Sequence, residues 1–290
     1  MSINGFFLII ASALSHVLWN TFLKGANHKP SAILLMMVVA VVLMGGHTLW
    51  VGETSQVFHI PIVLAALVSG FFFFLYQYCV ALAYGQGDLS QVYPLTITAP
   101  IYIAIWSYFF LGEHVSLIGF GGICLLLYGA VTIQTGTFRL HWRTFVQGNI
   151  RHNGVLMALL AAFVYSFGAI ADKVGVGNGA IAAYTFDVCL FMLVFHCIWM
   201  VVSNGFGRVV RELQEKPTIA MFGGIAMMVS FITFRSGLVE MPASYAAALR
   251  QVSTLFGVAL GFFIFRETFG IKRIMSALLI VVGAVLIRLG

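Results

Sequence analysis

The chain has 290 residues, of which 61% are hydrophobic and only 8% are charged, and its formal net charge is +6. A soluble domain carries about 25% charged residues, so this composition excludes a soluble globular protein and indicates a chain surrounded by lipid. A nucleic-acid-binding protein is excluded as well, because the basic residues lie in short gaps between apolar runs and form no single basic face.

Apolar runs long enough to cross a bilayer fill almost the whole chain. A spanning helix needs about 20 mostly apolar residues. The sequence predicts ten, at residues 4–24, 31–51, 60–84, 89–111, 115–135, 153–173, 179–203, 217–239, 243–265 and 269–289. No Lys or Arg precedes the first run, which is too long for a signal peptide, so we interpret it as a membrane helix. The segment 204–216 has the length of a short interfacial helix.

The first predicted helix carries a polar stripe. His16, Asn20 and Lys24 follow one another at intervals of four residues and therefore share one helix face, which Trp19 flanks. Lys24 is long enough to reach the membrane surface, whereas His16 and Asn20 need protein or water around them. We interpret the stripe as the wall of a binding cavity for a small acid or zwitterion. In it, His16 is either a structural residue or a carrier of coupling protons.

Polar residues in the third, fourth and sixth predicted helices are further candidates for a cavity lining. Tyr76 lies in the third helix and Tyr93 in the fourth, whose two prolines either kink the helix or expose its backbone carbonyls. Tyr165 lies eight residues before Lys173 in the sixth helix, so both side chains project from one face. All four residues belong to the predicted substrate-binding set.

Several charges lie inside the predicted helices of the second half. Each costs about 2.5–3.5 kcal/mol in a membrane and needs a partner or a function. Asp187 lies in the seventh helix, Arg235 in the eighth and Arg250 in the ninth. Either Asp187 forms an ion pair that braces one arginine, or one arginine binds a substrate carboxylate through two parallel hydrogen bonds. We favour the deeper Arg250 for the substrate and include its neighbours Tyr245 and Gln251.

The end of the chain resembles its middle. The stretch GEHVSLIGFGGICLLLYGAVTI, at 112–133, resembles RETFGIKRIMSALLIVVGAVLI, at 266–287. In both, a glutamate precedes a Gly-Ala-Val by sixteen residues. The two glutamates are 154 residues apart (267 − 113), and the same distance separates Leu95 from Leu249. We interpret the two glutamates, Glu113 and Glu267, as helix caps.

This repeat predicts the organisation of the chain. We expect a first five-helix repeat over 1–135, a linker over 136–152 and a second five-helix repeat over 153–290. Because five is odd, the second copy enters the membrane from the opposite side, and such inverted repeats are typical of transporters. The predicted fold is an all-α integral membrane protein of ten transmembrane helices, a 5+5 inverted repeat around a central cavity.

The positions of the basic residues predict an orientation. Loops after odd-numbered helices hold eleven of them: Lys24, Lys29, Arg139, Arg143, Arg151, Arg208, Arg211, Lys216, Arg266, Lys272 and Arg273. Loops after even-numbered helices and the termini hold only Lys173 and Arg288. Because basic loops stay in the cytoplasm, the odd-numbered loops are expected to be cytoplasmic and both termini outside.

Two five-helix halves, each ending in a short GE or RE turn and a Gly-Ala-Val helix, resemble the drug/metabolite transporter superfamily, and among its branches the EamA-type bacterial permeases. The resemblance covers nearly the whole chain. It implies a ten-helix basket with a central cavity, used for metabolite export across the bacterial inner membrane. The small multidrug-resistance relatives bind cationic drugs with a glutamate in the first helix, where this chain has no acidic residue.

The expected function is secondary transport, as an exporter, of a small carboxylate-bearing or zwitterionic metabolite, such as an amino acid or an amino-carboxylate metal chelator. One alternative is a cationic drug or quaternary-amine exporter, which would use Asp172 or Asp187. Another is a membrane scaffold that transports nothing. An enzyme is not expected, because GxxxxGK[ST], HExxH and GxSxG motifs are all missing.

The remaining expectations concern cofactors and partners. The four cysteines lie inside apolar runs without a CxxC pattern, so they indicate small core or lipid-facing residues. No metal and no cofactor are expected. The expected partners are a small-molecule metabolite and the lipid bilayer, but no nucleic acid, and the protein is expected to act as a monomer.

Overall fold

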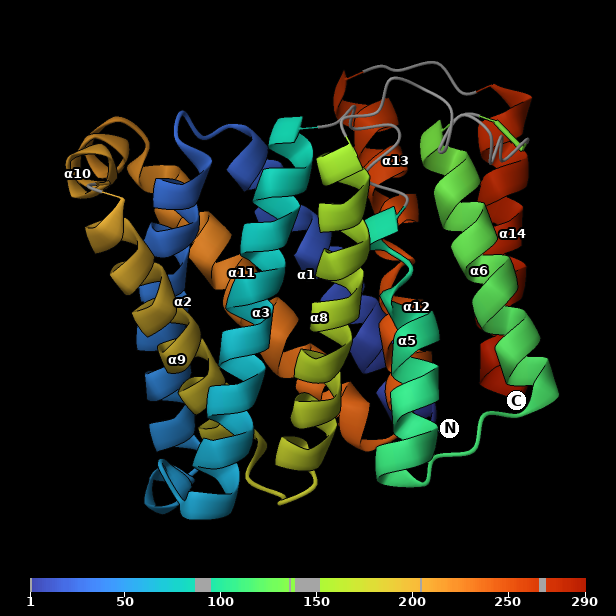
Figure 1. Cartoon of the computed structure of the whole chain (residues 1–290), viewed down its shortest axis with the longest axis horizontal. Coiled ribbons are helices and arrows are strands. Elements are labelled where there is room, and N and C mark those ends of the chain that lie inside the picture. The colour runs from blue at the N-terminus through green and yellow to red at the C-terminus, as the bar shows by residue number, and fades with distance from the viewer. Residues whose placement is uncertain (1, 87–94, 136, 139–151, 204, 266–269) are drawn as a thin grey trace. The chain divides into compact units, whose positions relative to one another are not determined.

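The computed structural model describes residues 2–86, 95–135, 137–138, 152–203, 205–265 and 270–290, and within these ranges all regular structure is helical. Figure 1 shows the helices α1 (Ile3–Lys24), α2 (Lys29–Trp50), α3 (Ile60–Gln86), α5 (Ala99–Trp106), α6 (Leu117–Thr135), α8 (His152–Val176), α9 (Ile181–Val202), α10 (Phe206–Glu215), α11 (Pro217–Val239), α12 (Ala243–Arg250), α13 (Ser253–Phe265) and α14 (Ile271–Leu289). A 3-10 turn, η1 (Thr54–Gln56), and a π-helical turn, η2 (Ser107–Leu111), complete the described elements.

Seven of the described helices are long and apolar enough to cross a membrane, namely α1, α2, α3, α6, α8, α9 and α11. The predicted count of ten spans is therefore not confirmed. Of the fourth predicted span, the structure describes residues 95–111, whose helical part is α5 with η2. The ninth is divided into α12 and α13, and the tenth, α14, carries basic residues at both ends.

The helices pack into two compact units. One, called here the α2/α9 unit, comprises residues 2–74 and 171–240, and the other, the α6/α14 unit, comprises 75–170 and 241–290. Each unit combines helices from both halves of the sequence. The predicted repeat over 1–135 and 153–290 therefore describes the order of the chain, whereas packing follows a different division.

In the α2/α9 unit, each of two helices is capped by a carboxylate that follows the other one. Glu53, after α2, accepts hydrogen bonds from the backbone N–H groups of Ala182 and Ala183 at the start of α9 (2.8 and 3.0 Å). Glu212, after α9, accepts from the N–H groups of Asn27 and His28 at the start of α2 (3.0 and 2.8 Å). The start of each helix thus lies at the end of the other, so α2 and α9 are antiparallel.

In the α6/α14 unit, glycines bring α6 and α14 into backbone contact. A Cβ at Gly122 would lie 2.7 Å from the backbone nitrogen of Ile287, and one at Gly129 would lie 2.9 Å from the nitrogen of Ile280. Later residues of α6 meet earlier residues of α14, so this pair is also antiparallel. Both antiparallel pairs join counterparts in the two sequence halves, the second span with the seventh and the fifth with the tenth, as an inverted repeat requires.

Candidate functional site

The α6/α14 unit contains a break inside a predicted span. The helix α12 ends at Arg250, Gln251 and Val252 form a turn, and α13 begins at Ser253 (Figure 1). Here the backbone hydrogen bonds span three residues instead of the four of an α-helix. The N–H of Val252 donates to the carbonyl of Leu249 (3.0 Å), and the N–H of Thr254 donates to that of Gln251 (3.0 Å). The hydroxyl of Thr254 donates to the same Gln251 carbonyl (2.8 Å), a competition with the backbone that weakens a helix.

The fourth predicted span is interrupted at the matching place. Ile97 and Thr98 form a turn before α5, and the offset that pairs Leu95 with Leu249 aligns this turn with Gln251–Val252. The Thr98 hydroxyl donates to the Leu95 carbonyl (2.7 Å), and Pro100 has no N–H to contribute to a helix ladder. Among the described residues, both sequence repeats therefore have a turn at this matching position.

The two interrupted spans pack against each other. The helices α5 and α12 are in contact, and Glu113, which follows η2, accepts a hydrogen bond from the N–H of Ala243 at the start of α12 (2.8 Å). The expected cap at Glu113 is therefore present, but on α12. The start of α12 lies beyond the end of α5 and η2, so the two helices are antiparallel and Arg250 lies at the end of α12 that is nearer the start of α5.

The chemistry of this break suits an anion. Arg250 is half-buried at the C-terminal end of α12, and its guanidinium can donate two parallel hydrogen bonds to a carboxylate. The start of α13 adds the positive end of its helix dipole, although the N–H groups of Thr254 and Leu255 already donate to the carbonyls of Gln251 and Val252. Gln251, which was included in the predicted set as a neighbour of Arg250, lies in the turn itself.

Tyr245, which was predicted together with Arg250 and Gln251, has a different environment. The Tyr245 ring is 3% exposed, and its hydroxyl accepts a hydrogen bond from the N–H of Ser116 (3.2 Å). A Cβ at Gly119 would collide with this hydroxyl. Tyr245 therefore lies in the packed region near the start of α12, away from the break at its end.

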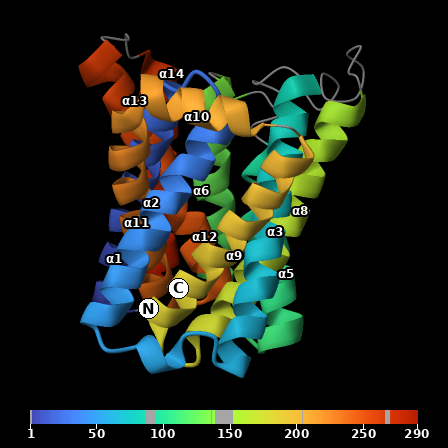
Figure 2. The ribbon, with the colours of Figure 1, turned by 90° about the vertical axis from the view of Figure 1, so that its left-hand side faces the viewer.

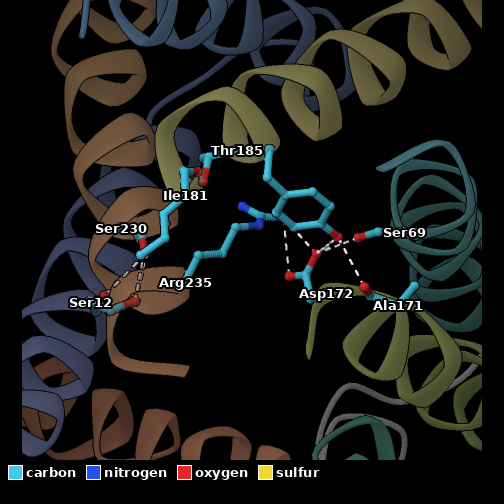
Figure 3. A network of polar contacts seen from close by, with 9 residues as sticks. Ser12, Ser69, Ala171, Asp172, Ile181, Thr185, Ser230 and Arg235 are labelled. Carbon is cyan, nitrogen blue, oxygen red and sulfur yellow. Dashed lines mark hydrogen bonds and ion pairs between the residues drawn. The ribbon is translucent and has the colours of Figure 1, made fainter. Parts of the chain in front are cut away.

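The α2/α9 unit contains a buried ion pair between Arg235 of α11 and Asp172 of α8 (Figure 3). The guanidinium nitrogen Nη2 lies 3.2 Å from Oδ1 and 3.1 Å from Oδ2 of Asp172. Oδ1 also accepts hydrogen bonds from Ser69 (2.6 Å) and from the hydroxyl of Tyr184 (2.8 Å). The guanidinium carbon lies 5.7 Å from the ring centroid of Tyr184, within the range of a cation–π interaction.

Asp187 was expected to form an ion pair with one of the arginines, but the partner of Arg235 is Asp172. Asp187 instead accepts a hydrogen bond from the backbone N–H of Phe58 (3.0 Å). Asp172 was expected at the end of the sixth span, but α8 continues to Val176 and places Asp172 a full turn inside the helix. With Asp172 at 0% and Arg235 at 3% exposure, both charges are buried and neutralise each other.

Two members of this network were not predicted. Tyr184 precedes Asp187 by three residues in α9, so it shares a polar face with a residue that the sequence does single out, and that spacing was the available signal. Ser69 lies alone in an apolar run and becomes recognisable only when α3 is placed beside α8.

The polar stripe on α1 is turned mostly outward. Asn20 and Lys24 are exposed and His16 is half-buried, and the Asn20 amide donates to the carbonyl of His16 (2.7 Å). The ring of His16 meets Trp19 edge-on at 5.1 Å between centroids. Trp19 is buried, and its indole N–H has no hydrogen-bond acceptor among the described residues.

The remaining predicted residues lie in separate places. Lys173 donates from Nζ to the carbonyl of Leu238 near the end of α11 (2.8 Å). In the α6/α14 unit, the rings of Tyr76 and Tyr165 meet at 5.0 Å between centroids, so their joint placement on a cavity wall is geometrically consistent. Tyr93 lies outside the described residues.

A cavity of about 380 Å³ lies along α5 and η2. Its lining is mostly apolar, with the hydroxyl of Tyr108 and the carboxylate of Glu113, which already caps α12, as its polar groups. Across the described residues, no group of three His, Cys, Asp or Glu side chains is placed to hold a metal ion.

Comparison with known proteins assigns a family through one family model that matches most of the chain. The model of the EamA-like transporter family matches twice, over residues 3–135 and 152–289. An uncharacterized transporter of Methanothermobacter thermautotrophicus is 26% identical over 205 residues, which are 69% of this chain and span 57% of that relative's length. A crystal structure of another protein superposes with a TM-score of 0.77 at 17% identity, over 99% of this chain and 95% of the other.

Proposed function

The chain belongs to the EamA-like transporter family, and we propose a specific function for this multi-pass membrane transporter. We propose that it is a secondary active transporter that exports a small carboxylate-bearing or zwitterionic metabolite across the bacterial inner membrane by alternating access. Ten spans in a 5+5 inverted repeat, without a cofactor, are part of this proposal, and so is the orientation with odd-numbered loops in the cytoplasm.

The observation that carries the substrate class is the position of Arg250 at the break between α12 and α13. Transporters commonly bind substrates where spanning helices are discontinuous, because the ends of the half-helices offer charges and backbone groups inside the membrane. An incoming carboxylate loses its hydration, and the guanidinium replaces part of the lost hydrogen bonds beside the positive end of the α13 dipole. Gln251, in the turn itself, supplies an amide within the same segment.

A cationic substrate would need a carboxylate that is not already neutralised. Asp172 is paired with Arg235 and accepts two further hydrogen bonds, and Asp187 accepts the N–H of Phe58. Asp172 is thus neutralised by the fold, whereas Oδ1 of Asp187 is buried without a hydrogen-bond partner among the described residues. Asp187 is therefore the carboxylate that the alternative, a quaternary-amine exporter, would use, and the preference for an acidic or zwitterionic solute is based on Arg250.

The test is counterflow in proteoliposomes. The purified protein is reconstituted in vesicles preloaded with one unlabelled solute, and uptake of the same labelled solute is measured. The panel contains amino acids, dicarboxylates, an amino-carboxylate chelator and a quaternary amine. We expect counterflow for a carboxylate-bearing solute alone. Counterflow of only the quaternary amine would overturn the substrate class, and a protein that gives none with any solute fits the scaffold alternative.

A further inference from the structure

The helix α10 lies between two membrane spans and crosswise to them. It connects the end of α9 at Val202 with the start of α11 at Pro217, and both Figure 1 and Figure 2 show it across the end of α2. A helix that joins two spans in this direction lies at the boundary between the bilayer and water.

One side of α10 is anchored to the protein. Val209 is 7% exposed and packs in a cluster with Leu34, Leu35 and Met200. Glu212 is 3% exposed and accepts the two N–H groups at the start of α2. The position of α10 is therefore linked directly to the N-terminal end of α2.

A second side of α10 is apolar and uncovered. Phe206, Val210 and Leu213 are 47%, 54% and 47% exposed, and their spacing of four and three residues places them on one stripe of the helix. An exposed apolar stripe on a helix at the bilayer boundary is the pattern of an interfacial helix, whose apolar face enters the region between headgroups and acyl chains.

The acidic and basic side chains beside this stripe differ in their contacts. Both carboxylates of α10 are directed to the start of α2, Glu212 to the backbone and Glu215 to the side-chain amide of Asn27 (2.7 Å). The basic residues Arg211 and Lys29 are exposed, and Arg208 is exposed while it contacts His28. The outward charge of this region is therefore positive, although α10 itself has as many acidic as basic residues.

We propose that α10 is a binding site for the headgroups of anionic lipids, with its apolar stripe inserted into the bilayer surface and Arg208 and Arg211 on the phosphates. Membrane-proximal basic residues attract anionic lipids. Because Glu212 ties α10 to α2, headgroup binding holds the start of α2 in place and stabilises the α2/α9 unit.

The test compares nanodiscs of phosphatidylcholine alone with nanodiscs that also contain phosphatidylglycerol. We expect phosphatidylglycerol to raise the unfolding midpoint of the wild-type protein, and high salt to reduce that gain, because salt screens exposed charges. Arg211→Gln should bind phosphatidylglycerol about fivefold more weakly in a lipid titration by native mass spectrometry, and Arg208→Gln combined with Arg211→Gln should remove most of the gain.

Lys272→Gln is the matched control, because it removes one exposed positive charge at the start of another helix, α14, in the α6/α14 unit. It should keep the full gain. The proposal is overturned if Arg211→Gln binds phosphatidylglycerol as the wild type does, or if Lys272→Gln loses as much as Arg211→Gln. Arg211 is exposed, so its variant tests binding without disturbing the packed side of α10.

Discussion

Arg235 and Arg250 are two arginines in consecutive predicted spans, yet their surroundings differ. Arg235 is buried, paired with Asp172 and covered by Tyr184 and Phe231. Arg250 is half-buried at a helix end, beside the start of a second helix. The charge of Arg235 is thus part of an ion pair within the fold, whereas the charge of Arg250 lies at a helix discontinuity, where it adds to the field of a helix end.

The largest effect that can break this comparison is expected at Arg235. Arg235→Gln leaves Asp172 as an uncompensated buried charge, which costs about 3–5 kcal/mol. We expect most of the variant to be lost as aggregated protein in size-exclusion chromatography. Asp172→Asn in the same chain should restore part of the folded fraction, because the unpaired charge is then gone. A stable single variant that fails only in substrate binding would mean that Arg235 belongs to the binding site.

A smaller loss of stability is expected at the cap on α9. Glu53→Ala removes the acceptor of two N–H groups at Ala182 and Ala183, both of which are buried, and leaving buried groups unsatisfied costs about 1–3 kcal/mol. The unfolding midpoint should fall while the affinity for substrate stays the same. The exposed Glu240 offers a matched control, and Glu240→Ala should leave the midpoint nearly unchanged. Equal losses in both variants would remove the structural role assigned to Glu53.

The sequence predicts the long helices well because hydropathy alone determines them. The predicted runs 4–24, 31–51 and 217–239 end within a few residues of α1, α2 and α11. The same measure cannot detect the break after Arg250, because Gln251, Val252 and Ser253 hardly lower the mean hydropathy of their run. A threonine near each break was the finer signal. The hydroxyl of Thr254 donates to the carbonyl three residues before it, and so does that of Thr98, which lies two positions before the residue that the repeat offset matches to Thr254.

The sequence alone does not show which side chains on different helices form an ion pair. Asp187 and Asp172 are both acidic residues near Arg235 in the predicted helix count, and only the packing of α8 against α11 selects Asp172. Arg250, in contrast, was singled out by depth alone, and its place at a helix break adds a physical reason that depth did not provide.

The smallest expected effect concerns pH and the link between α10 and α2. Partial burial, and then the nearby Arg208 guanidinium, lower the pKa of His28 below its ordinary value of 6.5, while Glu212 opposes the shift. His28 therefore binds a proton more readily in the unfolded chain than in the folded protein. Protonation thus favours unfolding, and the free energy of unfolding decreases as the pH falls through about 6.5. Unfolding midpoints between about pH 8 and pH 5 should show a shallower acid loss for His28→Gln than for the wild type. An identical slope in both would exclude His28 as a contributor.

The central claim is that Arg250 binds the substrate and Arg235 does not. Its most direct test is the rise in unfolding midpoint that a solute identified by counterflow produces in wild type, Arg250→Gln, Arg250→Lys and the double variant Arg235→Gln/Asp172→Asn. We expect Arg250→Gln to fold but to bind at least about tenfold more weakly, since hydrogen bonds to a charged group contribute about 1.5–3 kcal/mol. Arg250→Lys should bind with intermediate affinity, and the folded double variant should respond as the wild type does. A full substrate-induced rise in Arg250→Gln would contradict the account.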